Sequence, residues 1–350
     1  MKSNYEPLGK HIRLVDYRNS EEVTSTVLGI SIDKEFMPSV ANVIGTDLSR
    51  YKLISKGLFA CNPMHVGRDE RLPIALYEKD NAAIVSPAYF MFEIIVRDVL
   101  NEEYLMMWFR RPEFDRECWF MTDGSVRGGI SWDDLCRIQL PVPPYERQLD
   151  VVESYRAITR RIAMKKEIND NLEAVLAASH SKMFFSKDTS EHSKLGELMT
   201  FGNGKSRPKT DGPIPVYGGN GVLSYTDHHN IENAVLIGRV GAYCGSVYLE
   251  QGICWVSDNA IFAKSKITKD EFFDYFLLKR LNLFNHHVGT GQQLLTQEIL
   301  NNIEVPKPVT EQIELFNRKA TSIFETIFTN SREIIRLQEL SDLLLSRLAG

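Results

Sequence analysis

The sequence lacks several features that would place it in common protein classes. It contains no run of eighteen or more apolar residues, which excludes an ordinary membrane-spanning helix, and its N-terminal residues lack the apolar core of a signal peptide. The five cysteines include no C-x-x-C pair, so neither a zinc ribbon nor a disulfide framework is indicated. We therefore expect a cytoplasmic protein with reduced cysteines and no contact with a membrane.

The motifs of enzymes that act on nucleotides or nucleic acids are also missing. Gly202-Asn203-Gly204-Lys205-Ser206 resembles the end of a phosphate-binding loop, but Met199 stands where that loop requires glycine. A base methyltransferase needs Asn or Asp before its Pro-Pro-aromatic run to hold the amino group, whereas Val142 precedes Pro143-Pro144-Tyr145. The adjacent pairs His228-His229 and His286-His287 do not indicate a metal site, because neighbouring side chains point apart in a strand and rarely chelate together. We expect no catalytic residue, cofactor or metal in this chain.

Positive charge is not in excess in either of the two repeated halves of the sequence. The formal net charge is −5; residues 1–143 hold 17 Lys and Arg against 21 Asp and Glu, and residues 194–309 hold 11 against 11. Because neutralising phosphates usually supplies much of the affinity for nucleic acid, any nucleic-acid surface must be a local patch, or a partner must supply much of the positive field.

An internal repeat organises the chain. Three pairs of segments correspond: Leu8-Gly9-Lys10 with Leu195-Gly196-Glu197, Val85-Ser86-Pro87-Ala88-Tyr89-Phe90 with Val256-Ser257-Asp258-Asn259-Ala260-Ile261-Phe262, and residues 135–148 with residues 300–312. The third pair follows Gly124-Ser125 and Gly289-Thr290, and it carries an Ile-x-[Leu/Val]-Pro-x-Pro segment that leads to Gln148 or Gln312. In both copies the prolines end a short apolar strand, because proline cannot continue a ladder.

A long amphipathic helix is predicted after each copy, from about Glu146 to Phe185 and from about Thr310 to Leu348. The apolar stripes are Leu149, Val152, Tyr155, Ile158, Ile162, Ile168, Leu172, Val175, Leu176 and Met183, and then Ile313, Phe316, Ala320, Ile323, Ile327, Ile334, Leu337, Leu344 and Leu348. A helix on the order of 60 Å long with one stripe needs a partner along its length. An ordinary core helix would show a similar stripe, but the duplication favours pairing of the two helices, which would hold the globular halves apart around an approximate two-fold axis.

The predicted fold is therefore α+β, with two mixed α/β domains separated by two long antiparallel helices that form a coiled coil. The whole is a pseudo-two-fold internal repeat. We predict a first domain at residues 1–143, a first long helix at 144–190, a second domain at 191–308 and a second long helix at 309–350.

These features resemble the specificity (S) subunits of type I restriction-modification systems, over nearly the whole chain. The resemblance is carried by the two Leu-Gly openings, by Gly124-Ser125 and Gly289-Thr290, and by the two proline-bounded segments before the helices. It implies that each half is a target-recognition domain for one part of a bipartite double-stranded DNA site, and that the helices fix the gap between the parts.

The resemblance also implies partners. It predicts assembly with two copies of a DNA adenine methyltransferase subunit, and with ATP-dependent restriction subunits when DNA is cut, so that S-adenosylmethionine and ATP bind to those partners. Three alternatives stay open: a separate specificity subunit of a type II (IIB-like) enzyme, a self-contained methyltransferase, and a structural adaptor with two protein-binding heads on a coiled coil.

Candidate DNA-binding residues are those that could reach base edges or phosphates. In the second half they are Lys205, Ser206, Arg207 and Lys209, then Tyr217, Asn220 and Tyr225 around a glycine-rich turn, then Arg239 and Tyr243, and finally Gln292 and Gln293, whose amides can pair with adenine. In the first half they are Asn62, His65, Arg68, Arg71, Ser125 and Arg127. Because solvated turns carry the same residue types, each loop is a stronger prediction as a set than any of its members.

Overall fold

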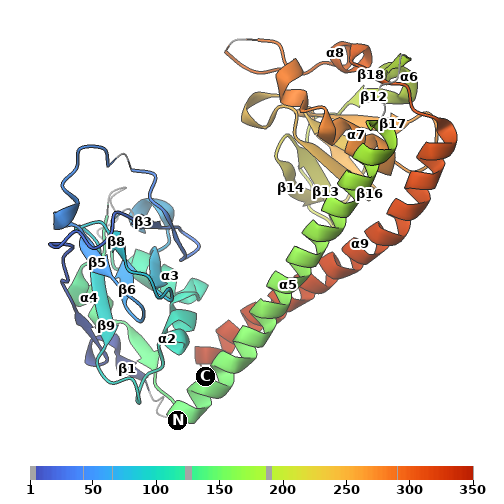
Figure 1. The fold of residues 1–350 in the computed structure, drawn as a ribbon. Helices are drawn as coiled ribbons and strands as arrows, with labels where there is room; N and C mark the ends of the chain where they lie inside the picture. Colours follow the sequence, from blue (N-terminus) through green and yellow to red (C-terminus); the bar gives the residue numbers. More distant parts are fainter. Residues whose placement is uncertain are drawn as a thin grey trace. The chain divides into compact units, whose positions relative to one another are not determined.

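The computed structural model describes residues 5–41, 43–64, 66–122, 128–186, 191–289 and 291–349. The chain forms two compact units. Unit 1 comprises Met1–Met164 together with Glu333–Gly350, and unit 2 comprises Lys165–Arg332. Both long helices therefore contribute residues to both units, and Figure 1 traces them in green and red.

The described strands of unit 1 form two four-stranded sheets and one strand pair. Their orders are β2 (Ile12–Leu14), β9 (Phe90–Ile94), β6 (Phe59–Cys61) and β7 (Ile74–Leu76); β4 (Phe36–Pro38), β3 (Val27–Ile30), β8 (Ala83–Val85) and β5 (Lys52–Ile54); and β1 (Tyr5–Pro7) with β10 (Gln139–Pro141). The helices are α1 (Val66–Asp69), α2 (Glu102–Phe109), α3 (Pro112–Phe120) and α4 (Trp132–Arg137), with short turns η1 (Leu8–Lys10) and η2 (Leu48–Arg50).

The core of unit 1 lies between its first sheet and α2. The rings of Phe59 and Phe92 stack with centroids 5.0 Å apart, and the ring of Phe109, from α2, is nearly perpendicular to that of Phe59, with centroids 6.0 Å apart. Asn101 begins α2 because its side-chain oxygen accepts hydrogen bonds from the backbone N–H groups of Glu103 and Tyr104. This cap fixes the helix that covers the sheet.

The described strands of unit 2 form one six-stranded sheet and one strand pair. The sheet order is β12 (Met199–Asn203), β17 (Ala260–Ser265), β15 (Ile231–Gly238), β16 (Val247–Val256), β13 (Ile214–Gly218) and β14 (Gly221–Thr226), and the pair is β11 (His192–Lys194) with β18 (Glu304–Pro306). The helices are α6 (Leu195–Leu198), α7 (Phe272–Arg280) and α8 (Gln297–Asn302), with η3 (Gly241–Tyr243) and η4 (Leu283–His286).

The central strand β15 is buried on both faces. Because successive side chains of a strand point to opposite sides, Val235 and Ile237 enter the core shared with α7 and the long helices, while Ala234 and Leu236 enter a second, smaller core. A continuous run of apolar residues in this strand is the sequence signature of that double burial.

The internal repeat is present in the structure. The strand order β2-β9-β6-β7 of unit 1 recurs in unit 2 as β12-β17-β15-β16, with every neighbouring pair antiparallel. The strand pairs β1–β10 and β11–β18 also correspond. The proline-bounded strands that the sequence predicts are β10 and β18, and each leads into a long helix.

The two Leu-Gly openings occupy matching positions. The backbone N–H of Leu8 donates to the carbonyl of Ile138 at 2.8 Å, and that of Leu195 donates to Ile303 at 2.9 Å. A Cβ on Gly9 would lie 2.8 Å from the Cβ of Cys136, and one on Gly196 would lie 2.5 Å from the side-chain oxygen of Asn301. Glycine is therefore required at both places because a helix packs directly against the backbone.

The two long helices are α5 (Tyr145–Phe184) and α9 (Thr310–Ser346), the latter followed by η5 (Arg347–Ala349). Both predicted helices are confirmed, and they run antiparallel within each unit (Figure 1). In unit 1 the Nε of Arg161 donates to Glu333 at 2.6 Å. In unit 2 the amide of Asn330 donates to the amide oxygen of Asn169 at 2.9 Å.

The predicted apolar stripe of α9 is confirmed, but that of α5 is wrong at three positions. On α9, Ile313, Phe316 and Ala320 are buried in the core of unit 2. On α5, Leu149, Ile168 and Val175 are 37%, 44% and 60% exposed. The contact with α9 is made instead by a polar residue, Asn169, which hydrogen-bonds Asn330 and Ser331 as well as the backbone of Ile327.

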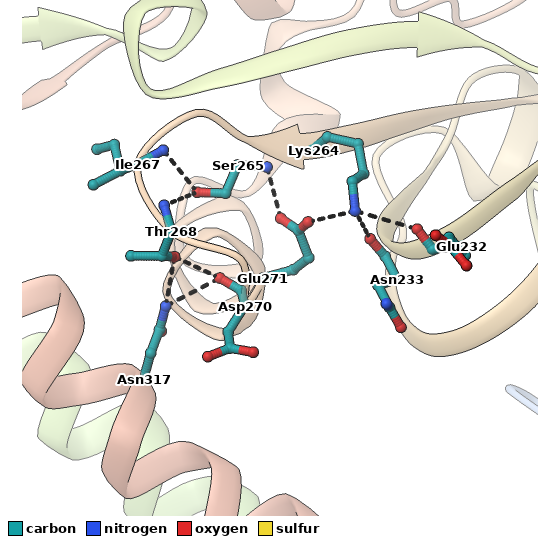
Figure 2. A network of polar contacts seen from close by, with 9 residues as sticks. All are labelled: Glu232, Asn233, Lys264, Ser265, Ile267, Thr268, Asp270, Glu271 and Asn317. Carbon is teal, nitrogen blue, oxygen red and sulfur yellow. Dashed lines mark hydrogen bonds and ion pairs between the residues drawn. The ribbon is translucent and has the colours of Figure 1, made fainter.

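A polar network closes the connection between β17 and α7 (Figure 2). The carboxylate of Glu271, which is 1% exposed, accepts the backbone N–H of Ser265 at 2.7 Å and pairs with Lys264 at 2.9 Å. Burial raises the pKa of Glu271. Beside it, the amide of Asn317 donates to the Thr268 hydroxyl at 2.9 Å and to the Asp270 carbonyl at 3.0 Å. This network ties α9 to the globular part of unit 2.

Candidate nucleic-acid interface

The cationic loop of unit 2 follows β12 and is held to β16 through its backbone. The N–H of Lys205 donates to the Val256 carbonyl at 2.9 Å, and the backbone of Lys205 forms a parallel β-bridge with that of Ser257. The side chains of Lys205, Arg207 and Lys209 are exposed, and none forms an ion pair with any residue that the structure describes. Their positive charges are available for phosphates.

This loop lies against β14. A shallow pocket of about 410 Å³ is lined by Arg207, Lys209 and Tyr225, among others, and Tyr225 is 57% exposed. The hydroxyl of Thr210 fixes the loop by bonding Thr226 at 2.9 Å and the carboxylate of Asp227 at 2.5 Å. The result is a surface on which cations adjoin an exposed aromatic ring.

A second group of predicted residues meets after β15. The N–H of Leu295 donates to the carbonyl of Arg239 at 2.9 Å, and the N–H of Gly241 donates to the carbonyl of Gln293 at 3.1 Å. These bonds join the segment that carries Arg239 and Tyr243 to the segment that carries Gln292 and Gln293. Both Tyr243 and Gln292 are exposed.

The glycine-rich turn between β13 and β14 reaches the same place. A Cβ on Gly238 would lie 2.1 Å from the carbonyl oxygen of Tyr243 and 2.8 Å from that of Gly219. Only glycine at position 238 allows the backbones around Gly219 and Tyr243 to approach the end of β15 so closely. The exposed Asn220, next to Gly219, is therefore brought near Arg239 and Tyr243.

The guanidinium of Arg239 is incompletely satisfied. Its Nε is buried and has no hydrogen-bond partner among the described residues, and its backbone is held by Asn259 and Leu295. A buried donor without a partner costs free energy. An acceptor on a bound nucleic acid could remove that cost, since arginine pairs with guanine edges and with phosphates.

One predicted residue of unit 2 is engaged within the protein. The hydroxyl of Tyr217 donates to Glu250 at 3.0 Å, and its ring packs near that of Tyr248, at a centroid distance of 6.4 Å. Burial, together with the Glu250 carboxylate, raises the pKa of Tyr217. The Tyr217 hydroxyl therefore stabilises the sheet.

In unit 1 the described candidates are Asn62, Arg68 and Arg71. Asn62 accepts the N–H of Met64 at 3.2 Å and so shapes its own turn. Arg68 pairs with Asp69 through two hydrogen bonds of 2.7 and 2.9 Å, and Arg71 pairs with Asp33 at 3.2 Å. Both guanidinium charges are thus locally neutralised. His65, Ser125 and Arg127 lie outside the described residues.

The loops of unit 1 nevertheless meet as those of unit 2 do. Four backbone hydrogen bonds correspond in pairs: Ile130 N–H to Pro63 (3.1 Å) with Leu295 N–H to Arg239 (2.9 Å), and Gly67 N–H to Gly128 (3.0 Å) with Gly241 N–H to Gln293 (3.1 Å). In each unit a helix starts directly afterwards, α4 capped by Ser131 and α8 capped by Thr296. The predicted loops therefore occupy equivalent places in the two units.

Sequence reasoning did not select the segment that connects these loops in unit 2, the turn Ser257–Asn259. The N–H of Ser257 donates to the carbonyl of Tyr217 at 2.9 Å, and the carbonyl of Asn259 accepts the N–H of Arg239 at 3.0 Å. Asp258 and Asn259 are exposed. A signal was present, because the turn aligns with Ser86-Pro87-Ala88 in the repeat, but nothing in the sequence placed it beside the other loops.

Within the described ranges there is no group of three or more His, Cys, Asp or Glu residues that could hold a metal ion. Nor does any described helix combine the length and apolar character needed to cross a membrane. What the converging loops offer is exposed cations, amides and aromatic rings, which suit binding to phosphates and base edges.

Comparison with known proteins identifies relatives of this arrangement. Residues 187–343 match a family described as the type I restriction modification DNA specificity domain. The S subunit of a type I restriction-modification system from M. genitalium superposes with a TM-score of 0.62 at 15% identity, and the match covers 100% of this chain and 97% of that chain.

Two further solved structures match over most of their length. The HsdS subunit from Thermoanaerobacter tengcongensis gives a TM-score of 0.39 at 16% identity, with 99% of this chain and 96% of that chain covered. A chain from a study of complex assembly and conformational transition of the type I R-M system gives 0.48 at 17% identity, with 98% and 96% covered. No curated protein sequence matches the chain. Residues 187–343 thus match the type I restriction modification DNA specificity domain, and the whole chain has the fold of a type I restriction-modification S subunit.

Proposed function

We propose that this protein is the DNA-recognition subunit of a type I restriction-modification system and that it directs partner enzymes to a bipartite double-stranded target. The observation that carries the proposal is the duplication in three dimensions. Each unit repeats the same four-stranded order, and in each the same two loops meet beside a capped helix. Each unit then reads one part of the target. The match of residues 187–343 to a DNA specificity domain supports this role for the second half of the chain.

We propose that the chain assembles with methyltransferase and restriction subunits, with two copies of the adenine methyltransferase, one for each repeat. We also propose that the chain has no active site of its own, so that S-adenosylmethionine and ATP bind to the partner subunits. We also propose that the complex is cytoplasmic, because it reads cellular DNA.

The converging loops of unit 2 supply the means of recognition. Exposed Lys205, Arg207 and Lys209 would position the phosphates, while Arg239 and Gln292 would reach base edges. Phosphate contacts fix the register, and base contacts select the sequence. The modest net charge of the protein is consistent with a local patch of this kind.

The test is to express the chain with the methyltransferase subunit of its own system and to map methylated adenines across the host genome. We expect one bipartite motif with a fixed gap, and no such motif when the methyltransferase is expressed alone. A structural adaptor would leave the methylation pattern unchanged. Titration of S-adenosylmethionine against the purified chain, which should show no binding, separates the proposal from a self-contained methyltransferase.

A further inference from the structure

The turn Ser257–Asn259 lies at the centre of the loops of unit 2. It contacts the cationic loop through the backbone β-bridge between Ser257 and Lys205. It touches the β13–β14 hairpin through the hydrogen bond from Ser257 to Tyr217, and the segment after β15 through the hydrogen bond from Arg239 to Asn259. Every predicted DNA-binding segment between β12 and β16 is therefore in direct contact with this turn.

Two side chains in this turn carry unused hydrogen-bonding capacity. The carboxylate of Asp258 is exposed, and no hydrogen bond or ion pair to a described residue involves it. The hydroxyl of Ser257 is 1% exposed and also lacks a described partner. A buried polar atom without a partner is uncommon in proteins and calls for a reason, and here it belongs to the residue directly before Asp258.

The turn does not need an aspartate in order to form. In unit 1 the N–H of Tyr89 donates to the carbonyl of Ser86 at 3.1 Å, and in unit 2 the N–H of Ala260 donates to Ser257 at 3.0 Å. The repeat therefore builds the same turn with Pro87-Ala88 in one copy and with Asp258-Asn259 in the other. The preference of aspartate for turns does not account for Asp258.

A carboxylate also weakens phosphate binding in a surface that otherwise presents cations. What it can do, and a cation cannot, is accept a hydrogen bond from the exocyclic amino group of a base. In the major groove that group is N4 of cytosine or N6 of adenine, and aspartate is a known acceptor for the former.

We propose that Asp258 is a specificity-determining residue, which selects a base pair that presents an amino group in the major groove. This inference rests on the proposed function, and it assigns one position in one part of the bipartite target to a residue of unit 2. Lys205 and Arg239 flank it, so phosphate positioning and base selection would occur side by side.

The experiment selects bound duplexes from a randomised library, using the full chain assembled with its methyltransferase partner. For Asp258→Ala we expect discrimination to fall roughly tenfold to a hundredfold at one base pair of one part of the motif. The other part is the internal control and should stay unchanged. The identity of the lost base, C or A, tells which amino group is read. Asp258→Asn should shift that position toward adenine, because an amide pairs with N6 and N7.

Two further variants keep the test independent of folding. The double substitution Asp258→Pro, Asn259→Ala copies the turn of unit 1 and should also lose discrimination at that base pair. Asp270→Asn changes an exposed aspartate at the opposite end of β17 and should change nothing.

Two outcomes for Asp258→Ala would overturn the inference. One is an unchanged motif. The other is an affinity gain of equal size for every sequence, which would mean that Asp258 acts only through its charge. If the unaltered complex enriched no motif at all, the proposed function itself would fail instead.

Discussion

The side-chain amide of Gln148 accepts a hydrogen bond from the backbone N–H of Asn101 at 2.9 Å. Its nitrogen donates to the carbonyls of Val99 and Pro143, both at 2.8 Å, and the residue is fully buried. Gln148 thus satisfies three backbone groups where α5 leaves the globular part of unit 1.

In unit 2 the same task belongs to Asn317, on α9. Its oxygen accepts the N–H of Phe273, at the start of α7, at 2.9 Å, while its nitrogen donates to Thr268 and Asp270 (Figure 2). On each of these two helices a buried amide therefore contacts the globular part of the unit and accepts a backbone N–H at the start of α2 or α7.

Removing either amide should destabilise the unit that contains it. For Gln148→Ala and Asn317→Ala we expect a loss of at least about 1–3 kcal/mol in the free energy of unfolding, because buried backbone groups lose their partners. Urea denaturation followed by circular dichroism measures the loss. The matched control is Gln312→Ala, on the exposed face of α9, which should change stability by less than about 0.5 kcal/mol. Equal effects of all three variants would contradict this role of the two amides.

The contrast between Gln312 and Asn317 shows where sequence reasoning reached its limit. The repeat, the proline-bounded strands and both long helices were predictable because periodicity and proline placement act locally. The sequence match aligns Gln148 with Gln312, yet Gln312 is exposed. Which turn of α9 faces α7 depends on how the helix is rotated in the folded unit, and the sequence does not contain that information directly.

The candidate interface was predictable as a set of loops and not as single residues. Glycines and exposed cations mark the loops, but Arg68 and Arg71 pair with Asp69 and Asp33. Asp33 lies 38 residues from Arg71, so only the fold brings that pair together. The central position of Ser257 arises in the same way, from backbone contacts with strands that are distant in sequence.

The cationic loop should contribute electrostatically to DNA binding. Replacing Lys205, Arg207 and Lys209 together by alanine should weaken binding of the assembled complex to its site. It should also reduce the slope of log affinity against log salt by up to about 0.9 for each lost phosphate contact. Fluorescence anisotropy over a range of salt concentrations measures both quantities.

The matched control is a triple alanine variant of Lys194, Lys266 and Lys307, whose ammonium groups bond Asn302, Gly196 and Glu191. This variant should leave the slope unchanged. If the loop variant kept its affinity and its slope, the cationic loop would not lie at the DNA.

His180 should make unit 2 sensitive to acid. The residue is 1% exposed and surrounded by five aromatic rings with centroids 5.1–6.0 Å away, those of Phe184, Phe185, Phe273, Phe276 and Phe316. Burial, with a smaller effect of Arg280, lowers the pKa of His180 to about 4. The unfolded chain therefore binds a proton between about pH 6.5 and 4 that the folded unit does not, so stability falls as the pH is lowered through this window.

His180→Leu should remove that sensitivity. Relative to the unaltered protein, the variant should gain up to about 3 kcal/mol between pH 7 and pH 4, since each pKa unit corresponds to about 1.36 kcal/mol. Denaturant unfolding at a series of pH values gives the difference. The exposed His192 supplies the control: the unfolding free energy of His192→Leu should change with pH in parallel with that of the unaltered protein. A constant offset for His180→Leu at every pH would show that His180 is not held neutral.

Asp274 should have the opposite effect, in the alkaline direction. Its carboxyl group is 1% exposed on α7, and burial, reinforced by the nearby Glu271, raises its pKa to about 8. Between about pH 3.8 and 8 the folded unit retains a proton that the unfolded chain has lost, so the contribution of this group to stability declines as the pH rises. Asp274→Asn keeps the shape but cannot ionise. It should therefore become progressively more stable than the unaltered protein from pH 5 to pH 9, by more than about 1 kcal/mol.

Asp270→Asn, at an exposed position just before α7, is the control and should show no such trend. Parallel stability curves for Asp274→Asn and the unaltered protein would contradict this prediction. They would mean that Asp274 is ionised in the folded unit throughout the pH range, with its negative charge compensated by Lys264 or by solvent.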